Sequence, residues 1–125
     1  MENQGNSSGT GAIVLVVDDD EDVRAVAVAA LADRGFEVLE AADGQSALAI
    51  MDRRPDIELV VTDVVMPGIS GFHVARGAKR RAKKVVMTSG YSSALVDGAI
   101  PADKFLAKPY RLAELQNTVG RLLAA

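Results

Sequence analysis

The sequence has no cysteine, and it has no apolar run long enough to cross a bilayer. Without cysteine there can be no disulfide, thiolate metal site or thiol catalysis, and this absence is typical of a reducing compartment. A membrane-spanning helix needs about 20 consecutive apolar residues. The opening MENQGNSSGTG is polar and small, so we expect no secretory signal. We therefore expect a cytoplasmic protein that makes no membrane contact.

Size and charge narrow the function classes further. With 125 residues, of which 49% are hydrophobic and 25% charged, the chain has room for one globular domain. A net charge of −3 argues against wholesale binding of nucleic acid. We expect residues 1–11 to form a disordered tail and residues 12–125 to form the domain. No helix-turn-helix or other reading module is left over, so we expect no DNA-binding domain in this chain.

From residue 12 onward, short apolar runs alternate with segments of helical periodicity. The apolar runs predict strands, over residues 12–17, 36–41, 57–62, 85–89 and 103–107. The periodic segments predict helices, over residues 20–35, 43–55, 71–84, 91–100 and 110–124. Strict alternation predicts an α/β fold with a parallel sheet between two layers of helices. Right-handed crossovers favour a doubly wound, flavodoxin-like (βα)5 arrangement with strand order 2-1-3-4-5.

Two of the predicted helices carry apolar stripes that we expect to face the core. In the first helix the stripe consists of Val23, Val26, Ala27, Ala30 and Leu31. In the last helix it consists of Leu112, Leu115, Val119 and Leu122. Burying such a stripe is how a helix packs onto a sheet.

Polar side chains gather where the predicted strands end, which is where ligands bind in such sheets. In chain order they are Asp18, Asp19, Asp20, Asp63, Thr88, Ser89 and Lys108. Clustered carboxylates repel one another unless a cation lies among them, and Mg²⁺ prefers oxygen ligands together with water. A lysine and a hydroxyl could hold an incoming phosphoryl group, and aspartate is a known covalent nucleophile. The predicted edge therefore suits a phosphoryl group attached to a carboxylate.

Simpler interpretations exist for several polar residues. Asp20, Glu21 and Asp22 fit the first turn of a helix, so we expect them to cap it while Asp18 and Asp19 bind metal. The basic run over residues 76–84 is most simply a solvated helix face, although it could dock an acidic partner.

Taken together, the motifs resemble the receiver domain of response regulators, the phosphoacceptor module of two-component signalling. The likeness runs from about residue 12 to residue 124. It rests on IVLVVDD with its acidic pair, on the intact D-x-x-M-P-x-x-x-G pattern over residues 63–71, on Ser89 followed by glycine, and on Lys-Pro-Tyr over residues 108–110. Each motif is weak alone, but together, in this order and at strand ends, they are highly specific.

The resemblance implies that Asp63 accepts a phosphoryl group from the phosphohistidine of a histidine kinase or histidine phosphotransfer protein. It implies that Asp19 binds Mg²⁺ directly and Asp18 through water, with Asp63 and the Val65 carbonyl as further ligands. The chain would then be a signalling phosphoacceptor, which assists its own phosphotransfer and dephosphorylation and signals to a downstream protein target.

The resemblance also assigns a switch. Ser89 would bond the phosphoryl oxygen, with Thr88 as its rival. Lys108 would pair with the phosphoryl group, and a cis peptide bond between Lys108 and Pro109 would aim the lysine inward. Phe105 would then turn inward and act by packing alone, because it lacks the hydroxyl of tyrosine.

Other functions remain to be weighed. A small phosphatase with a D-x-D nucleophile pair would leave the motif over residues 63–71 unexplained. A flavin- or nucleotide-binding protein is excluded, because three aspartates after the first strand would repel the phosphate of the ligand. A receiver-like interaction module that acts without phosphorylation stays open. So does the choice between a stand-alone receiver and one from a hybrid kinase.

Overall fold

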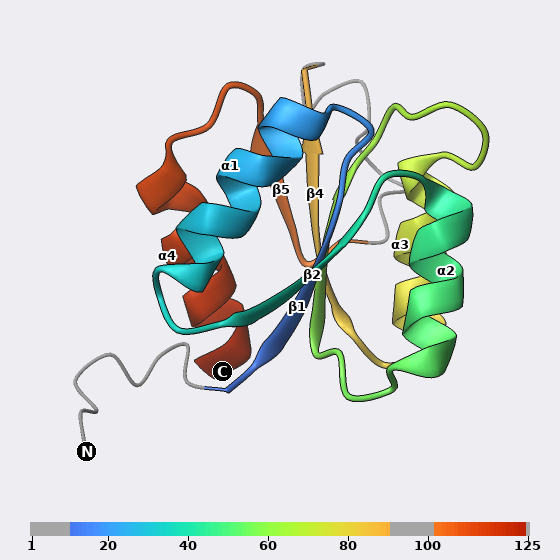
Figure 1. Cartoon of the computed structure of the whole chain (residues 1–125), viewed down its shortest axis with the longest axis horizontal. Coiled ribbons are helices and arrows are strands. Elements are labelled where there is room, and N and C mark those ends of the chain that lie inside the picture. Colours follow the sequence, from blue (N-terminus) through green and yellow to red (C-terminus); the bar gives the residue numbers. More distant parts are fainter. Residues whose placement is uncertain (1–10, 91–101, 125) are drawn as a thin grey trace.

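The computed structural model describes residues 11–90 and 102–124 as a five-stranded parallel sheet with helices on both faces (Figure 1). The strand order β2-β1-β3-β4-β5 is the predicted one. The strands are β1 (Ile13–Val17), β2 (Glu37–Ala41), β3 (Leu59–Asp63), β4 (Lys84–Ser89) and β5 (Lys104–Ala107). The described helices are α1 (Glu21–Ala32), α2 (Gly44–Arg53), α3 (Gly71–Arg80) and α4 (Leu112–Ala124). The helix expected over residues 91–100, and residues 1–10 of the tail expected over residues 1–11, lie outside the described residues.

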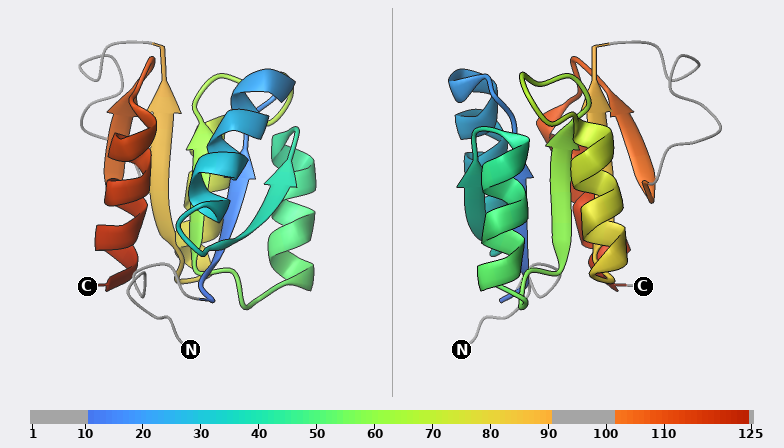
Figure 2. Two further views of the ribbon diagram at one scale, coloured as in Figure 1. Left: turned by 60° about the vertical axis from the view of Figure 1, so that its left-hand side comes forward. Right: turned by 90° about the vertical axis from the view of Figure 1, so that its right-hand side faces the viewer.

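The core has two halves, one on each face of the sheet. Helices α1 and α4 lie together on one face, and α2 and α3 lie on the other (Figure 2). Successive residues of β1 alternate between the halves: Val14 and Val16 pack towards α1 and α4, whereas Leu15 and Val17 pack towards α2 and α3. Because both faces of β1, β3 and β4 are covered, these strands must be almost wholly apolar until they end. Among the described helices, none is long and apolar enough to span a membrane.

The two predicted apolar stripes are only partly buried. Leu31, Leu115 and Val119 are in the core, but Val26 is 50% exposed and Leu112 is 43% exposed. The prediction was wrong for these two residues, because the stripe on each helix is wider than the strip that the sheet and the neighbouring helix cover. Both lie at the margin, where α1 and the start of α4 face each other across a groove.

Helix α3 ends at Arg80, earlier than predicted. Ala82 takes a left-handed conformation, with a φ of 62°, and the Lys83 amide donates to the Ala78 carbonyl, as in a common helix C-terminal motif. The chain then turns inward and buries Lys83, whose Nζ donates to the carbonyl of Ile57 at 2.7 Å. The interpretation of the basic run as a solvated face is therefore wrong for Lys83.

Two helical glycines differ in the room around them, which predicts different effects of alanine. At Gly120 an added Cβ would meet no atom within 4 Å, whereas at Gly77 it would lie 2.6 Å from Leu48 Cδ2. We expect Gly120→Ala to raise the free energy of unfolding by about 0.5–1 kcal/mol, because alanine is the better helix former. Gly77→Ala should gain less or lose stability, since Leu48 must move. Urea unfolding of both variants measures the difference, and equal gains would contradict this account of Gly77.

Candidate functional site

The acidic residues predicted at the sheet edge lie together in the structure. Asp18 directly follows β1, Asp63 ends β3, and parallel strands bring both ends to the same edge. Asp18, Asp19 and Asp63 each offer a carboxylate oxygen, and these oxygens all lie within 4.8 Å of one another. Such a cluster of negative charge is unfavourable unless a cation accompanies it.

Lys108 supplies one such cation. Its Nζ lies 2.9 Å from Asp18 Oδ2 and 3.3 Å from Asp63 Oδ2, so one ammonium bridges the ends of two strands. Burial lowers the pKa of Lys108, but the hydrogen bond to Asp18 and the charge of Asp63 outweigh burial and leave the pKa raised. Lys108 is therefore cationic at neutral pH. The peptide bond between Lys108 and Pro109 is cis, as the resemblance implied.

Asp63 is a buried, hydrogen-bonded acid at the end of β3. It is only 9% exposed, and its Oδ1 accepts the amide of Val64 at 2.9 Å. Burial raises the pKa of Asp63; the nearby Lys108 lowers it, the charge of Asp18 raises it again, and the net shift is upward. A carboxylate that is poorly solvated and faces an ammonium group is well placed to act on a phosphorus atom that approaches from solvent.

Asp18 and Asp19 differ in how much of their bonding capacity is used. Asp18 is buried, and both of its oxygens are engaged, Oδ1 by the Asp20 amide at 2.9 Å and Oδ2 by Lys108. Asp19 is exposed, and its carboxylate has no hydrogen bond within the described part of the chain. Three clustered carboxylates with one lysine keep a net negative charge and hard oxygen donors, so these residues fit Mg²⁺. Asp19 is the acid that can offer an oxygen without giving up another contact.

Asp20 has the capping role predicted for it. Its Oδ1 accepts the amides of Asp22 and Val23, both at 3.0 Å, and it is the N-cap of α1. Capping and candidate metal binding are thus divided among consecutive aspartates.

The loop after β3 explains the glycine that closes the predicted motif. Gly68 has a φ of 77°, and the Gly71 amide returns to the Val64 carbonyl at 2.9 Å. A Cβ at Gly71 would overlap the carbonyl oxygen of Asp63, so only glycine lets α3 start this close to the acid. Val65 is 53% exposed on this loop, and its carbonyl as a metal ligand stays a prediction.

The end of β4 joins both sides of the site through its backbone. The carbonyl of Thr88 accepts the amide of Val64 at 2.9 Å, and the carbonyl of Ser89 accepts the amide of Lys108 at 2.7 Å. Both hydroxyl residues are buried, so the choice of Ser89 over Thr88 stays a prediction. Phe105 is partly buried against the core half that includes α2 and α3, and its switching role also stays a prediction.

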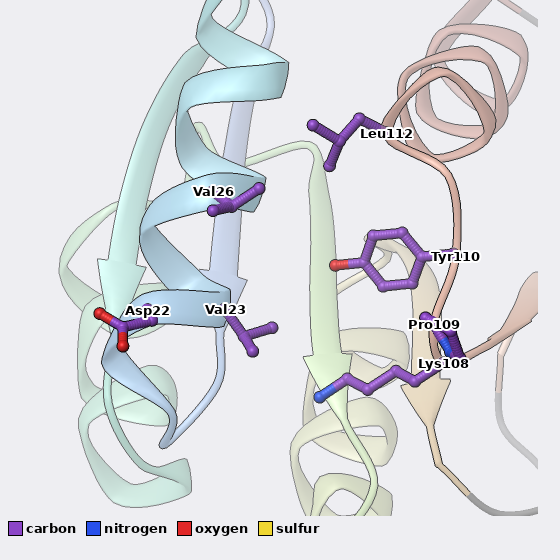
Figure 3. A pocket seen from close by; sticks show the side chains of 7 residues that line it. All are labelled: Asp22, Val23, Val26, Lys108, Pro109, Tyr110 and Leu112. Carbon is purple, nitrogen blue, oxygen red and sulfur yellow. The ribbon is translucent and has the colours of Figure 1, made fainter.

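A groove beside the site was not predicted from the sequence. It runs between α1 and the link from β5 to α4, has a volume of about 500 Å³, and is lined by Val23, Val26, Tyr110 and Leu112 with Lys108 at one end (Figure 3). Burial raises the pKa of Tyr110, so its hydroxyl stays neutral at physiological pH. The sequence assigned the apolar members of this groove to the core, so it gave no signal of an apolar surface next to the acids.

Comparison with known proteins gives concordant matches. A family model described as the response regulator receiver domain matches residues 14–120. The sensor kinase CckA of Brucella abortus (strain 2308) is 38% identical over 98% of this chain, which spans 14% of that kinase. The response regulator receiver protein CpdR of the same organism is 32% identical over 90% of this chain and 97% of CpdR. The structure of TrrA from Thermotoga maritima in complex with Mg²⁺-BeF matches with a TM-score of 0.80 and 32% identity, over 89% of this chain and 98% of that chain.

Proposed function

Because the chain belongs to the response-regulator receiver family, we propose that Asp63 accepts a phosphoryl group in two-component signalling, in a reaction that needs Mg²⁺. One observation carries the proposal: Asp63 lies 3.3 Å from the Lys108 ammonium, within an acidic cluster that fits a divalent cation. Nucleophile, cation site and anion partner are the parts that phosphoryl transfer to a carboxylate requires.

The donor is a phosphohistidine of a histidine kinase or histidine phosphotransfer protein. A carboxylate oxygen of Asp63 forms a bond to phosphorus as the bond from phosphorus to the imidazole nitrogen breaks. The electron pair of the broken bond returns to the imidazole, which takes up a proton. Lys108 exchanges part of its contact with Asp63 for a phosphoryl oxygen, and Ser89 donates its hydroxyl to another. Later attack by water on phosphorus breaks its bond to the Asp63 oxygen, which restores the carboxylate and releases inorganic phosphate, so the chain also assists its own dephosphorylation.

The metal ligands in this proposal are the carboxylates of Asp18, Asp19 and Asp63 and the carbonyl of Val65, with Asp18 acting through water. Bound Mg²⁺ supplies positive charge for the oxygens of the transferring phosphoryl group. The TrrA structure with Mg²⁺-BeF supports the choice of metal, because that relative holds Mg²⁺ together with a beryllium fluoride.

The signal follows from the added charge. Phosphorylation brings about −1.5 to −2 charges to the edge of the sheet. In the proposal Ser89 and Phe105 respond, and the surface around β4 and β5 shifts between two populations that a downstream protein target distinguishes. We also propose that the protein is cytoplasmic and that its domain spans residues 12–125.

Intact-mass measurement tests the proposal. The chain is incubated with acetyl phosphate and Mg²⁺, and we expect the mass of one added phosphoryl group. The added mass should be absent when EDTA is present during the incubation, and absent in Asp63→Asn. A chain that gains no mass would act as a receiver-like interaction module without phosphorylation. Retention of the phosphoryl group in Asp63→Asn would overturn the choice of acceptor.

We expect Asp19→Ala to lose Mg²⁺ binding while the metal-free fold stays intact. Saturating Mg²⁺ should stabilise the wild type, by about 2.7 kcal/mol at a concentration of 100 times the dissociation constant. The variant should gain almost nothing, because Asp19 has the free carboxylate. Urea unfolding with and without Mg²⁺ measures both. Asp22→Ala is the control, since Asp22 is also exposed near the start of α1 but lies outside the cluster. If Mg²⁺ stabilised Asp19→Ala as much as the wild type, Asp19 would not be a metal ligand.

A further inference from the structure

Arg24 reaches back from α1 to the loop that carries the acids. Its Nη1 donates to the carbonyl of Asp18 at 2.8 Å, and its Nε pairs with Glu40 Oε1 at 2.9 Å. Helical side chains lean towards the N-terminus of their helix, so an arginine one turn into α1 can reach the residue that follows β1. The Arg24 side chain is only 16% exposed, which is low for an arginine and shows that it is packed in place.

This contact completes the anchoring of the Asp18 backbone. The Asp18 amide donates to the carbonyl of Ala41 at the end of β2, and the Asp18 carbonyl accepts from Arg24. Glu40, the neighbour of Ala41, holds the other side of the guanidinium. Both backbone groups of Asp18 are therefore tied to the end of β2, one directly and one through Arg24.

We propose that Arg24 is a positioning residue for the cation-binding acids, and this inference rests on the function proposed above. By holding the Asp18 carbonyl, it fixes the peptide that joins Asp18 to Asp19, and so fixes the direction in which both carboxylates leave the chain. Among the described residues, the side-chain hydrogen bonds of Arg24 go to Asp18 and Glu40, and none goes to Asp63. Arg24 thus acts through Asp18, without touching the reacting group.

The charge of Arg24 and its positioning role predict opposite effects on metal affinity. Removing a positive charge next to Asp18 would by itself make Mg²⁺ bind more tightly. Releasing the loop would make Mg²⁺ bind more weakly, because the oxygens no longer converge; loss of such an outer contact typically costs about tenfold or more in metal affinity. The sign of the change in Arg24→Gln therefore separates the two explanations.

Calorimetric titration of the full chain with Mg²⁺, without any phosphodonor, is the test. For Arg24→Gln we expect the dissociation constant to rise about tenfold. Arg24→Lys keeps the charge but lacks the planar fork that makes both contacts, so its constant should also rise, by less. Amide chemical shifts of residues 18–20 in the metal-free chain should move in both variants.

Arg81→Gln is the matched control. Arg81 makes the same two kinds of contact, from Nη1 to the Gly77 carbonyl at 2.8 Å and from Nη2 to Asp52 at 2.8 Å. It follows the C-terminal end of α3, whereas the site lies at the N-terminal end of that helix. Its loss should leave the dissociation constant for Mg²⁺ unchanged.

The outcomes separate this inference from the proposed function. An unchanged or lower dissociation constant in Arg24→Gln, with a wild type that binds Mg²⁺ and accepts a phosphoryl group, would overturn the positioning role alone. A wild type that does neither would overturn the proposed function. Should Arg24→Gln fail to fold, Arg24→Lys decides, because it keeps the positive charge, so a rise in the dissociation constant comes from the lost contacts. We then expect a rise of about two- to threefold, smaller than for the complete loss of an outer contact, and no rise would overturn the inference.

Discussion

In Asp63→Asn we expect the metal-free protein to become more stable at neutral pH while it loses all phosphoacceptance. The pKa of Asp63 is raised, first by burial and further by the charge of Asp18, against the opposing effect of Lys108. The folded chain therefore holds this proton more tightly than the unfolded chain does. Ionisation of Asp63 lowers the free energy of unfolding as pH rises from the ordinary pKa of aspartate through the raised one. Asparagine has nearly the same shape and no charge, so it avoids this loss.

The pH dependence of the difference in stability between Asp63→Asn and the wild type identifies its cause. Urea unfolding in EDTA should show Asp63→Asn above the wild type at neutral pH, and the gap should close below about pH 4, where the wild-type carboxyl is protonated in both states. Asp52→Asn is the control, because Asp52 is an exposed carboxylate whose partner Arg81 also lies at the surface. A variant that is less stable than wild type at neutral pH, or equally shifted at all pH values, would contradict this account of Asp63.

Lys108→Met should have the opposite effect on the metal-free protein. Methionine keeps most of the aliphatic stem but removes the ammonium that lies 2.9 Å from Asp18 and 3.3 Å from Asp63. The pKa of Lys108 is raised in the fold, so its stabilising contribution is fully present below its ordinary pKa and is lost only as pH rises through the raised one. We expect a loss of about 2 kcal/mol at neutral pH, less than the 3–5 kcal/mol for a fully buried pair because Lys108 is partly solvated.

Mg²⁺ should reverse much of that loss. Without Lys108, no side-chain cation of the described residues pairs with these acids, so Mg²⁺ should bind the variant more tightly and stabilise it more than it stabilises the wild type. Urea unfolding in EDTA measures the loss of stability, and urea unfolding in Mg²⁺ measures how much of it the metal restores. Lys79→Met is the matched control, since it breaks an ion pair with Asp103 at the surface, where the expected loss is below about 1 kcal/mol. A Lys108→Met chain that is as stable as wild type in EDTA would contradict the bridging role.

The sequence was informative wherever a residue sits on a strand or directly at its end. The short apolar runs predicted every strand of the sheet, and the topology of a parallel sheet then required Asp18 and Asp63 to meet at one edge. No alternative position was available to them, because a one-residue error in a strand changes the face of a side chain but leaves its end at the same edge.

The sequence could not predict which residues at the margins of the helices the rest of the fold covers. Val26 and Leu112 have the right spacing for a core stripe, yet both lie at the open margin between α1 and the start of α4. Lys83 reads as one more surface cation, but the left-handed turn at Ala82 directs the chain inward just before it. Arg24 carries no motif signal at all, since the partners of its side chain are the backbone carbonyl of Asp18 and a glutamate on β2.

The most direct measurement locates the phosphoryl group on the chain. After reaction with acetyl phosphate and Mg²⁺, borohydride reduces an aspartyl phosphate to an alcohol, and peptide mapping by mass spectrometry finds the modified position. We predict that modification occurs at Asp63, that it requires Mg²⁺, and that Asp18 and Asp19 stay unmodified although they lie in the same cluster. Modification at either of those acids, or at Asp63 to the same extent in EDTA, would contradict the account.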